Sequence, residues 1–249
     1  MKKLILLLTT LLAQQLFALV SIIPVEIGVN PGYSGSIATS LETKRGNTNK
    51  DNYKFAIKVN YDSNKNFVTW AELSGEYGKS NNLKDTNKLY LHIRHIHAFS
   101  DQDTRMETFA QIQDDEFKLI KHRLLGGAGL RFKLFETLGD GKGYLGVGGF
   151  FEQIKYTSID PNEDNFRANF YFAYAADIGD DSSFSYNIYY QPNTQNFHDH
   201  ITAQTLALKL HIYKKFFFKF QLAYDSDTAA PLGVQKYDFT QTTSFVFDF

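Results

Sequence analysis

Apolar and polar residues alternate along most of the chain after Tyr33. Between Tyr53 and Tyr61 every second residue is aromatic or aliphatic, and the residues between them are Lys, Ala and Asn. The same period of two occurs at 166–178 and at 216–224. Side chains two positions apart share one face of a β-strand, whereas they diverge around a helix. The pattern therefore predicts strands with one apolar face and one polar face.

About twelve segments of this kind can be counted along the chain. Short connections such as "SNKN" and "LGDGK" alternate with mostly longer ones such as "GKSNNLKDT" and "SDTAAPLGVQ", with "DDE" near Asp114 as an exception. This alternation indicates an even-stranded meander with both termini at the short-turn end. The segments are 33–44, 52–61, 66–77, 87–99, 104–113, 117–134, 143–156, 165–178, 183–191, 201–213, 215–225 and 236–249.

The polarity of the two faces distinguishes a membrane barrel from a soluble one. A β-sandwich or a lipocalin-like barrel also alternates, but its outer face should be polar. Here one face is a near-continuous band of Phe, Tyr, Leu and Ile, and the other, rich in charged and amide side chains, would make a poor dry core. Strands of about 9–11 residues also suit a tilted membrane crossing. We therefore predict an all-β fold, a single transmembrane antiparallel up-and-down β-barrel of about 12 strands, over residues 33–249.

The first residues have the features of an export signal. A basic "MKK", a short apolar run and a cleavage region ending at Ala18 predict a signal peptide over residues 1–18. Residues 19–32 would then form an N-terminal lead-in to the barrel. Export and a transmembrane β-barrel together predict the outer membrane of a Gram-negative bacterium as the location.

Composition narrows the chemistry. The net charge of −1 gives no electrostatic reason for nucleic-acid binding. The absence of cysteine excludes a disulfide scaffold, a cysteine-based zinc site and a thiol nucleophile. Aromatic residues make up 16% of the chain, with 23 Phe and 15 Tyr, and they favour strands.

The chain ends in "TTSFVFDF", with Phe245, Phe247 and Phe249 on one face. In a barrel these rings would form the lipid-facing row of the last strand, which must pair with the first strand to leave no open edge. The ending also resembles the C-terminal aromatic signature of outer-membrane proteins. It predicts the barrel-assembly machinery as a partner.

Two stretches resemble a known family. "GYSGSIATSLETKRGNTNKDNY" resembles the opening hairpin of the DUF481 outer-membrane proteins, some of which are labelled salt-induced, and "DDEFKLIKHRLLGGAGLRFKL" resembles their central stretch. The resemblance implies a single outer-membrane barrel and assigns no chemistry. In "GGAG", small residues would leave space for a bulky lumen side chain of a neighbouring strand. The matching positions are Gly46, Asn47, Thr48, Asp115, Arg123, Gly127 and Gly129.

The polar faces supply the candidate functional residues. If the hairpin around Asn82 is symmetric, His92 lies opposite Glu72 and Arg94 lies opposite Trp70. A lumen network of Glu72, His92 and Arg94 is one hypothesis, and the plainer alternative is that paired charges simply fill the interior. The lumen candidates are Lys54, Lys58, Glu72, His92, Arg94, Arg167 and Lys219.

Metal binding is not predicted. His92 faces away from His95 and His97 on a strand, so the three cannot share one ion. His198 and His200 would need a further ligand, and the acidic loops "DDE" and "DPNED" match neither an EF-hand nor a glycine-rich calcium repeat. No cofactor is expected.

The predicted function is a narrow channel for small polar solutes or ions, or a structural envelope barrel, present as a monomer among outer-membrane lipids and lipopolysaccharide. The mixed signs of the lumen candidates give no ion preference. The alternative is a lipid-modifying enzyme of the phospholipase or lipid A deacylase type. Its nearest candidate nucleophile is Ser74, beside Glu72 and Glu76, but a lumen position would keep lipid away from it.

Overall fold

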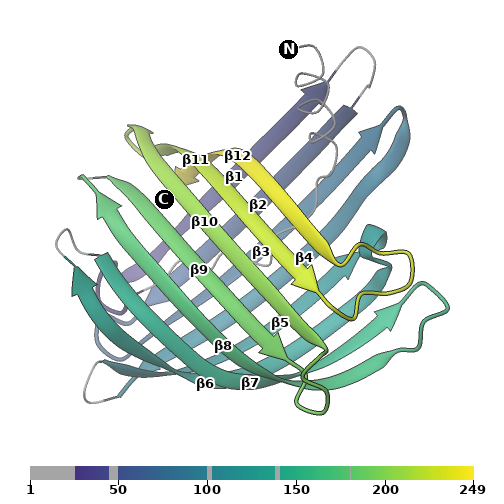
Figure 1. The fold of residues 1–249 in the computed structure, drawn as a ribbon. Helices are drawn as coiled ribbons and strands as arrows, with labels where there is room; N and C mark the ends of the chain where they lie inside the picture. Colours follow the sequence, from purple (N-terminus) through teal and green to yellow (C-terminus); the bar gives the residue numbers. More distant parts are fainter. Residues whose placement is uncertain (1–25, 45–49, 100–102, 138–140, 180) are drawn as a thin grey trace, which may run out of the picture.

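The computed structural model describes residues 26–44, 50–99, 103–137, 141–179 and 181–249. Within them, twelve antiparallel strands each pair with their neighbours in sequence, and the last pairs with the first to close a barrel (Figure 1). The predicted all-β, twelve-stranded, up-and-down barrel is confirmed. The predicted signal peptide, residues 1–18, and the first part of the lead-in lie outside the described residues.

Most strands extend somewhat beyond their predicted segments. The strands are β1 (Gly32–Lys44), β2 (Lys50–Asp62), β3 (Phe67–Ser80), β4 (Leu83–Ala98), β5 (Thr104–Asp115), β6 (Ile120–Thr137), β7 (Gly141–Tyr156), β8 (Glu163–Ile178), β9 (Ser182–Pro192), β10 (His200–Tyr213), β11 (Phe216–Asp227) and β12 (Tyr237–Asp248). The strand predicted over 117–134 is wrong at its start, where a 3-10 turn, η1 (Glu116–Lys118), precedes β6. Asp115 caps this turn by accepting a hydrogen bond from the Lys118 amide at 3.1 Å. In the described part of the chain no helix is long and apolar enough to cross a membrane.

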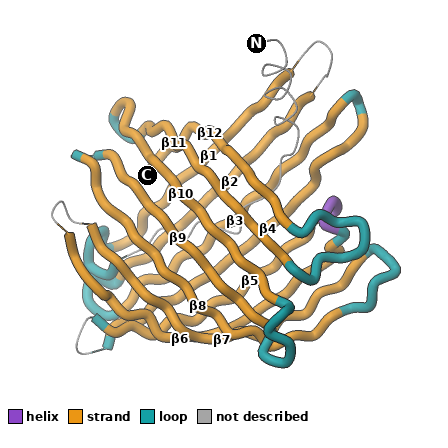
Figure 2. Tube along the Cα trace, viewed as in Figure 1, coloured by secondary structure: helices purple, strands orange, loops and turns teal. Residues whose placement is uncertain are grey.

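The two ends of the barrel differ in the length of their connections (Figure 2). Short turns such as 63–66 and 214–215 lie at the end where β1 begins and β12 ends, and longer loops such as 228–236 lie at the opposite end. One prediction of a long loop is wrong. Asn81 and Asn82 alone join β3 to β4, with φ values of 49° and 65°, as the two central residues of a type I′ hairpin require.

The distribution of polarity is inverted relative to a soluble protein. Large apolar side chains cover the outside, where Leu89 is 53% and Phe245 is 63% exposed. Charged side chains such as Arg131, Arg167 and Glu152 are almost completely buried inside. A surface of this kind is stable when the barrel is surrounded by lipid.

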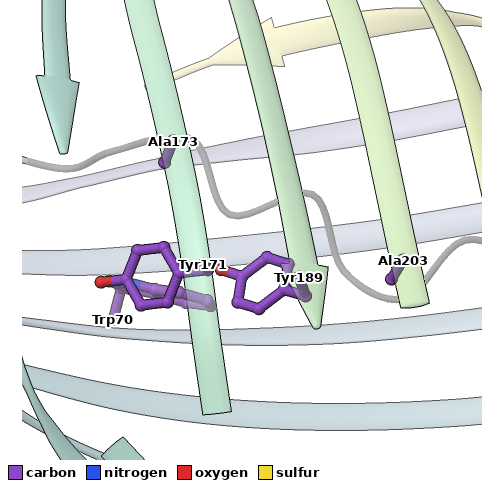
Figure 3. Packing of buried hydrophobic residues seen from close by; sticks show 5 residues of the cluster. All are labelled: Trp70, Tyr171, Ala173, Tyr189 and Ala203. Atoms are coloured by element: carbon purple, nitrogen blue, oxygen red, sulfur yellow. The ribbon is translucent and has the colours of Figure 1, made fainter. Parts of the chain in front are cut away.

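An aromatic cluster bridges the middle of the lumen. Trp70 of β3 packs in one buried cluster with Tyr171 of β8 and Tyr189 of β9, together with two alanines of β8 and β10 (Figure 3). The rings of Tyr171 and Tyr189 are 5.0 Å apart. In the order of strands around the barrel, β3 lies opposite β8 and β9, so these side chains connect facing walls. The interior is therefore divided into two sides at this height.

A row of stacked rings continues from Trp70 along the wall. His92 stacks on Trp70 at 4.9 Å and on Phe109 at 6.2 Å, and Phe109 meets Phe150 edge to face at 6.2 Å. Phe109 and Phe150 are on β5 and β7, and Gly127 of β6 lies between them. A Cβ at Gly127 would collide with both phenylalanine side chains. The prediction that the "GGAG" stretch leaves space for neighbouring lumen side chains is confirmed at this position.

Candidate functional site

All seven predicted lumen residues lie on inward faces of their strands. Lys54, Glu72 and Lys219 line one cavity and Lys58 lines another. His92 and Arg94 line a small pocket between the ring stack and the opposite wall, and Arg167 is 1% exposed. The inward position of these seven side chains is therefore observed, whereas their role in the passage of solutes or ions stays a prediction.

The predicted network of Glu72, His92 and Arg94 has the expected register but different contacts. His92 pairs with Glu72 and Arg94 with Trp70 in the β3–β4 ladder, as predicted. Arg94 nevertheless forms its ion pair with Glu107 of β5, at 3.2 Å. The His92 Nδ1 atom lies 3.4 Å from Gln111 Oε1. Grouping the three residues as one unit is therefore wrong, because long side chains reach past the facing residue to the next strand.

Glu107 is the centre of one buried charge cluster. Its carboxylate pairs with Arg94 and with Arg131, each at 3.2 Å, and accepts a 2.6 Å hydrogen bond from the Tyr171 hydroxyl. Glu107 is 2% and Arg131 1% exposed. Two guanidinium groups and a phenol compensate this carboxylate for its loss of water.

Glu152 is the centre of a second buried cluster. Arg123 donates to one of its oxygens from Nε and Nη2, at 2.9 and 2.6 Å, and Arg167 donates to the other. Arg167 also pairs with Asp199 at 2.9 Å, and Asn193 donates to Asp199 at 3.0 Å. Bidentate pairs of this kind are rigid as well as strong. Together with the first cluster, they fill the side of the lumen formed by β4–β8.

The family-motif positions have structural roles in this filled side. Asp115 caps η1, Arg123 holds Glu152, and Gly127 accommodates the ring stack. Gly129 faces Gly148 in the β6–β7 ladder. The positions Gly46, Asn47 and Thr48 lie outside the described residues.

The other side of the lumen contains open space. A lower cavity of about 530 Å³ lies at the short-turn end, and an upper cavity of about 190 Å³ lies above it. Polar residues of the lower cavity include Ser36, Lys58, Asn60, Asp177, Lys209 and Asp248. Polar residues of the upper cavity include Ser40, Lys54, Glu72, Ser74, Glu76, Lys219 and Thr242.

Three charged side chains stand where the two cavities approach each other. We call Lys58, Glu72 and Lys219 the charged layer. Glu72 interacts electrostatically with both lysines. The Lys58 ammonium also lies 4.5 Å above the Trp70 ring, so the charged layer adjoins the aromatic cluster of Trp70, Tyr171 and Tyr189. Space for a solute at this height is therefore bounded by two cationic groups, one anionic group and an indole.

A third cavity of about 60 Å³ continues toward the long-loop end. It shares Lys88 and Tyr90 with the upper cavity and is lined by residues of the loop 228–236. Lys118 and Asp238 pair across it at 2.8 Å. The three cavities thus follow one another from the short-turn end to the long-loop end of the lumen, and the third also borders Arg123 and Tyr156 of the filled side.

Among the described residues, the histidines, acidic loops and serine considered as metal-binding or catalytic groups do not come together in one site. Asp199 turns toward Arg167, away from the exposed His198. In the loop "DDE", Asp114 contacts His122 and Glu116 contacts Lys84, so the carboxylates diverge. No group of three His, Asp or Glu side chains able to hold a metal occurs among the described residues. Ser74 faces the upper cavity, which is the lumen position expected to keep lipid away.

Several lumen residues were not singled out from the sequence. Their signal was nevertheless present, because the period of two places them on the same faces as the predicted candidates. What the period does not give is which inward charges meet. These residues are Arg105, Glu107, Arg131, Lys142, Glu152 and Lys209.

Comparison with solved structures finds two porins and the translocator domain of an autotransporter, all at low identity. The NanC porin is 11% identical, with 86% of this chain and 97% of that chain covered and a TM-score of 0.49. The translocator domain of the autotransporter NalP from Neisseria meningitidis is 9% identical, covers 88% of each chain and has a TM-score of 0.49. The KdgM porin is 9% identical, with 87% and 96% covered and a TM-score of 0.42.

No curated protein matches the sequence. Residues 37–249 match the family described as "Protein of unknown function, DUF481". This match covers nearly all of the barrel, from β1 to the last residue. The chain therefore belongs to the DUF481 family.

Proposed function

We propose that the protein is an outer-membrane β-barrel that passes small polar solutes or ions along the open side of its lumen. The apolar outer surface supports a lipid environment, with outer-membrane lipids and lipopolysaccharide around it. The aromatic C-terminal strand supports the barrel-assembly machinery as a partner. Nothing in this proposal requires more than one copy of the chain.

The observation that carries the proposal is the series of three cavities. They extend from the short-turn end to the loop 228–236, and the charged layer lies between the two larger ones. Lys58 and Lys219 are held there by strands, with a single carboxylate, Glu72, between them. Small movements of these side chains would connect the cavities, because lysine has four rotatable bonds.

The charged layer also supports a weak preference for anions. Nearby, Lys54 is paired with Glu76 at 3.4 Å and Lys209 with Asp248 at 2.5 Å, so these lysines are largely neutralised. Lys58 and Lys219 share Glu72, which leaves one positive charge in excess in the charged layer. Rings of basic side chains favour anions in pores.

Planar-bilayer recording of the refolded barrel tests the channel. We expect small discrete conductance steps in 1 M KCl, and Ala38→Phe, which adds a ring to the wall of the upper cavity, should reduce them severalfold. Leu41→Phe changes a residue on the outward face of β1 that is 65% exposed and does not line the cavity, so it should leave the conductance unchanged. If no steps occur across a range of voltages, the channel proposal is wrong and a structural role is favoured.

A further inference from the structure

The residues just before β1 extend across the short-turn end of the lumen. We call residues 26–31 the strap. The carboxylate of Asp62, at the end of β2, accepts hydrogen bonds from the amides of Gly28 and Asn30 at 2.8 and 3.3 Å. Glu26, at the other end of the strap, contacts β5 and β7. The strap therefore connects two distant parts of the barrel wall.

Glu26 places its carboxylate in a cationic pocket. It pairs with Lys142 and accepts a hydrogen bond from the Tyr144 hydroxyl. The Arg105 Nη2 atom lies 3.7 Å from Glu26 Oε1. We call Arg105, Lys142 and Tyr144 the strap pocket. Tyr144 is 0% and Arg105 6% exposed, so these groups are fixed by the surrounding wall.

The charge around the strap pocket favours an anion. The Arg131 guanidinium lies 4.3 Å and the Arg105 guanidinium 5.7 Å from the centre of the Tyr144 ring. Arg131 is already paired with Glu107, which also serves Arg94. Asp103 acts electrostatically on Arg105 and forms its own ion pair with Lys133 at 3.1 Å.

A carboxylate in the pocket is thus surrounded by donors of three kinds. The guanidinium, ammonium and phenol groups are the donors that bind carboxylate and phosphate oxygens in proteins. Removing Glu26 would leave Arg105 and Lys142 facing one another with less compensation. The pocket is therefore suited to an oxyanion, whichever molecule supplies it.

The pocket is also open to solutes. Glu26, Lys142 and Tyr144 line the lower cavity of about 530 Å³, which is large enough to admit a small molecule. We propose that Arg105, Lys142 and Tyr144 form a binding site for a small oxyanion, a carboxylate or a phosphate, which Glu26 occupies as a tethered ligand until a solute displaces it. This goes beyond passage through the lumen, because binding at the strap pocket does not require conduction.

The test measures binding to the refolded full barrel in detergent. The probe is trifluoroacetate, whose ¹⁹F line width reports weak binding, and inorganic phosphate is then added as a competitor. A tethered carboxylate acts at an effective concentration of about 1 mM, so for a site that binds a free carboxylate with a Kd of about 0.1 mM, Glu26→Gln should bind the probe about tenfold more tightly than the wild type. Acetate is tested as a second competitor. Displacement of trifluoroacetate by phosphate at lower concentration than by acetate would identify phosphate as the preferred oxyanion, and the reverse order would identify carboxylate.

Two further variants locate the site. In the Glu26→Gln background, Lys142→Gln should abolish the gain, whereas Lys215→Gln, which removes a lysine from another part of the lower cavity wall, should retain it. Equal loss in both variants would mean general attraction to the cavity and would overturn the proposal. So would a Glu26→Gln barrel that binds no more tightly than the wild type.

A second route to the same result does not alter Glu26. Asp62→Ala removes the acceptor of the strap amides and leaves the strap pocket intact, so it should also tighten probe binding. Heat-modifiable gel mobility checks that each variant is folded. Conductance recorded on the same preparations separates the two proposals: binding without conductance supports the strap pocket alone, and conductance without binding supports the channel alone.

Discussion

Gly35 and Phe249 join the first and last strands of the barrel. Each donates its backbone amide to the carbonyl of the other, at 3.1 and 2.9 Å, so the last residue of the chain completes the β1–β12 ladder. The phenylalanine ring lies over the Gly35 backbone, where a Cβ would collide with it. The terminal aromatic and the glycine are therefore complementary in shape.

Replacing Gly35 by valine should destabilise the barrel. The added side chain must displace both the Phe249 ring and the backbone carbonyl of Lys58, and overpacking of this kind typically costs about 1–3 kcal/mol. The measurement is urea unfolding of the barrel refolded in lipid vesicles. Gly75→Val is the control, because a Cβ at Gly75 meets only one atom within 4 Å, at 3.9 Å. A loss of stability as large for Gly75→Val as for Gly35→Val would contradict the explanation.

Deletion of Phe249 should impair assembly in cells more than it impairs stability. The deletion removes the aromatic end on which recognition by the assembly machinery is predicted to depend, and two of the seam's backbone hydrogen bonds. The two measurements are the amount of heat-modifiable barrel in outer-membrane fractions and the unfolding midpoint of refolded protein. Equal proportional losses in both would argue that Phe249 is only a structural residue.

Glu152→Gln should cost about 3–5 kcal/mol, because it leaves Arg123 and Arg167 buried without their carboxylate. The substitution keeps the shape of the side chain, so the loss reports charge and not packing. Glu163→Gln is a matched control: Glu163 accepts from the neutral donors Tyr156 and Asn165 and should lose less than 1 kcal/mol. Equilibrium unfolding of the two variants decides the point.

Reversing a charge in the charged layer should change ion selectivity. Lys58→Glu or Lys219→Glu replaces the positive excess with a negative one, so the reversal potential in a KCl gradient should shift toward cation preference. Lys155→Glu makes the same change at an exposed position of β7 and should not shift it. If all three variants give the wild-type reversal potential, ions do not pass the charged layer.

The turn between β5 and β6 should respond to acid. Hydrogen bonds from Lys84 and then Asn87 hold the pKa of Glu116 below its ordinary value of 4.5. A depressed pKa means that the contact stabilises the fold above the unfolded value and is lost as pH falls through the lower folded value. Lys84→Met should raise the pKa of Glu116 toward 4.5 in an NMR titration. An unchanged pKa would show that Lys84 is not the cause.

The barrel and much of its register could be predicted from the sequence because strand geometry has a fixed period. Alternation placed Glu72, Trp70, His92 and Arg94 on one face, and a hairpin centred on Asn82 gives the observed pairing. The turn itself is centred between Asn81 and Asn82, and a register shift at Gly78/Lys79 restores that pairing. The glycines of β6 were informative for the same reason, since Gly127 lies between inward positions of two neighbouring strands.

The pairing of buried charges could not be predicted in this way. Arg94 and Arg131 reach Glu107 from two different strands, and Tyr171 reaches it from a third. Such contacts depend on barrel shape and side-chain length, and neither has a periodic signal. The contact of Glu26 with β5 and β7 could not be predicted for another reason. The strap precedes the first strand, and no alternation relates it to β7.

The contact of Trp70 with Tyr171 and Tyr189 should make unfolding of the barrel more cooperative. In a hollow barrel each strand touches only its two neighbours, so the strands form a ring in which damage could stay local. Trp70 joins the ring to itself at a point half a circumference away. Loss of β3 would therefore remove support from β8 and β9 at once. The protein should unfold as one cooperative unit, as a solid-cored domain does, and not strand by strand from the seam.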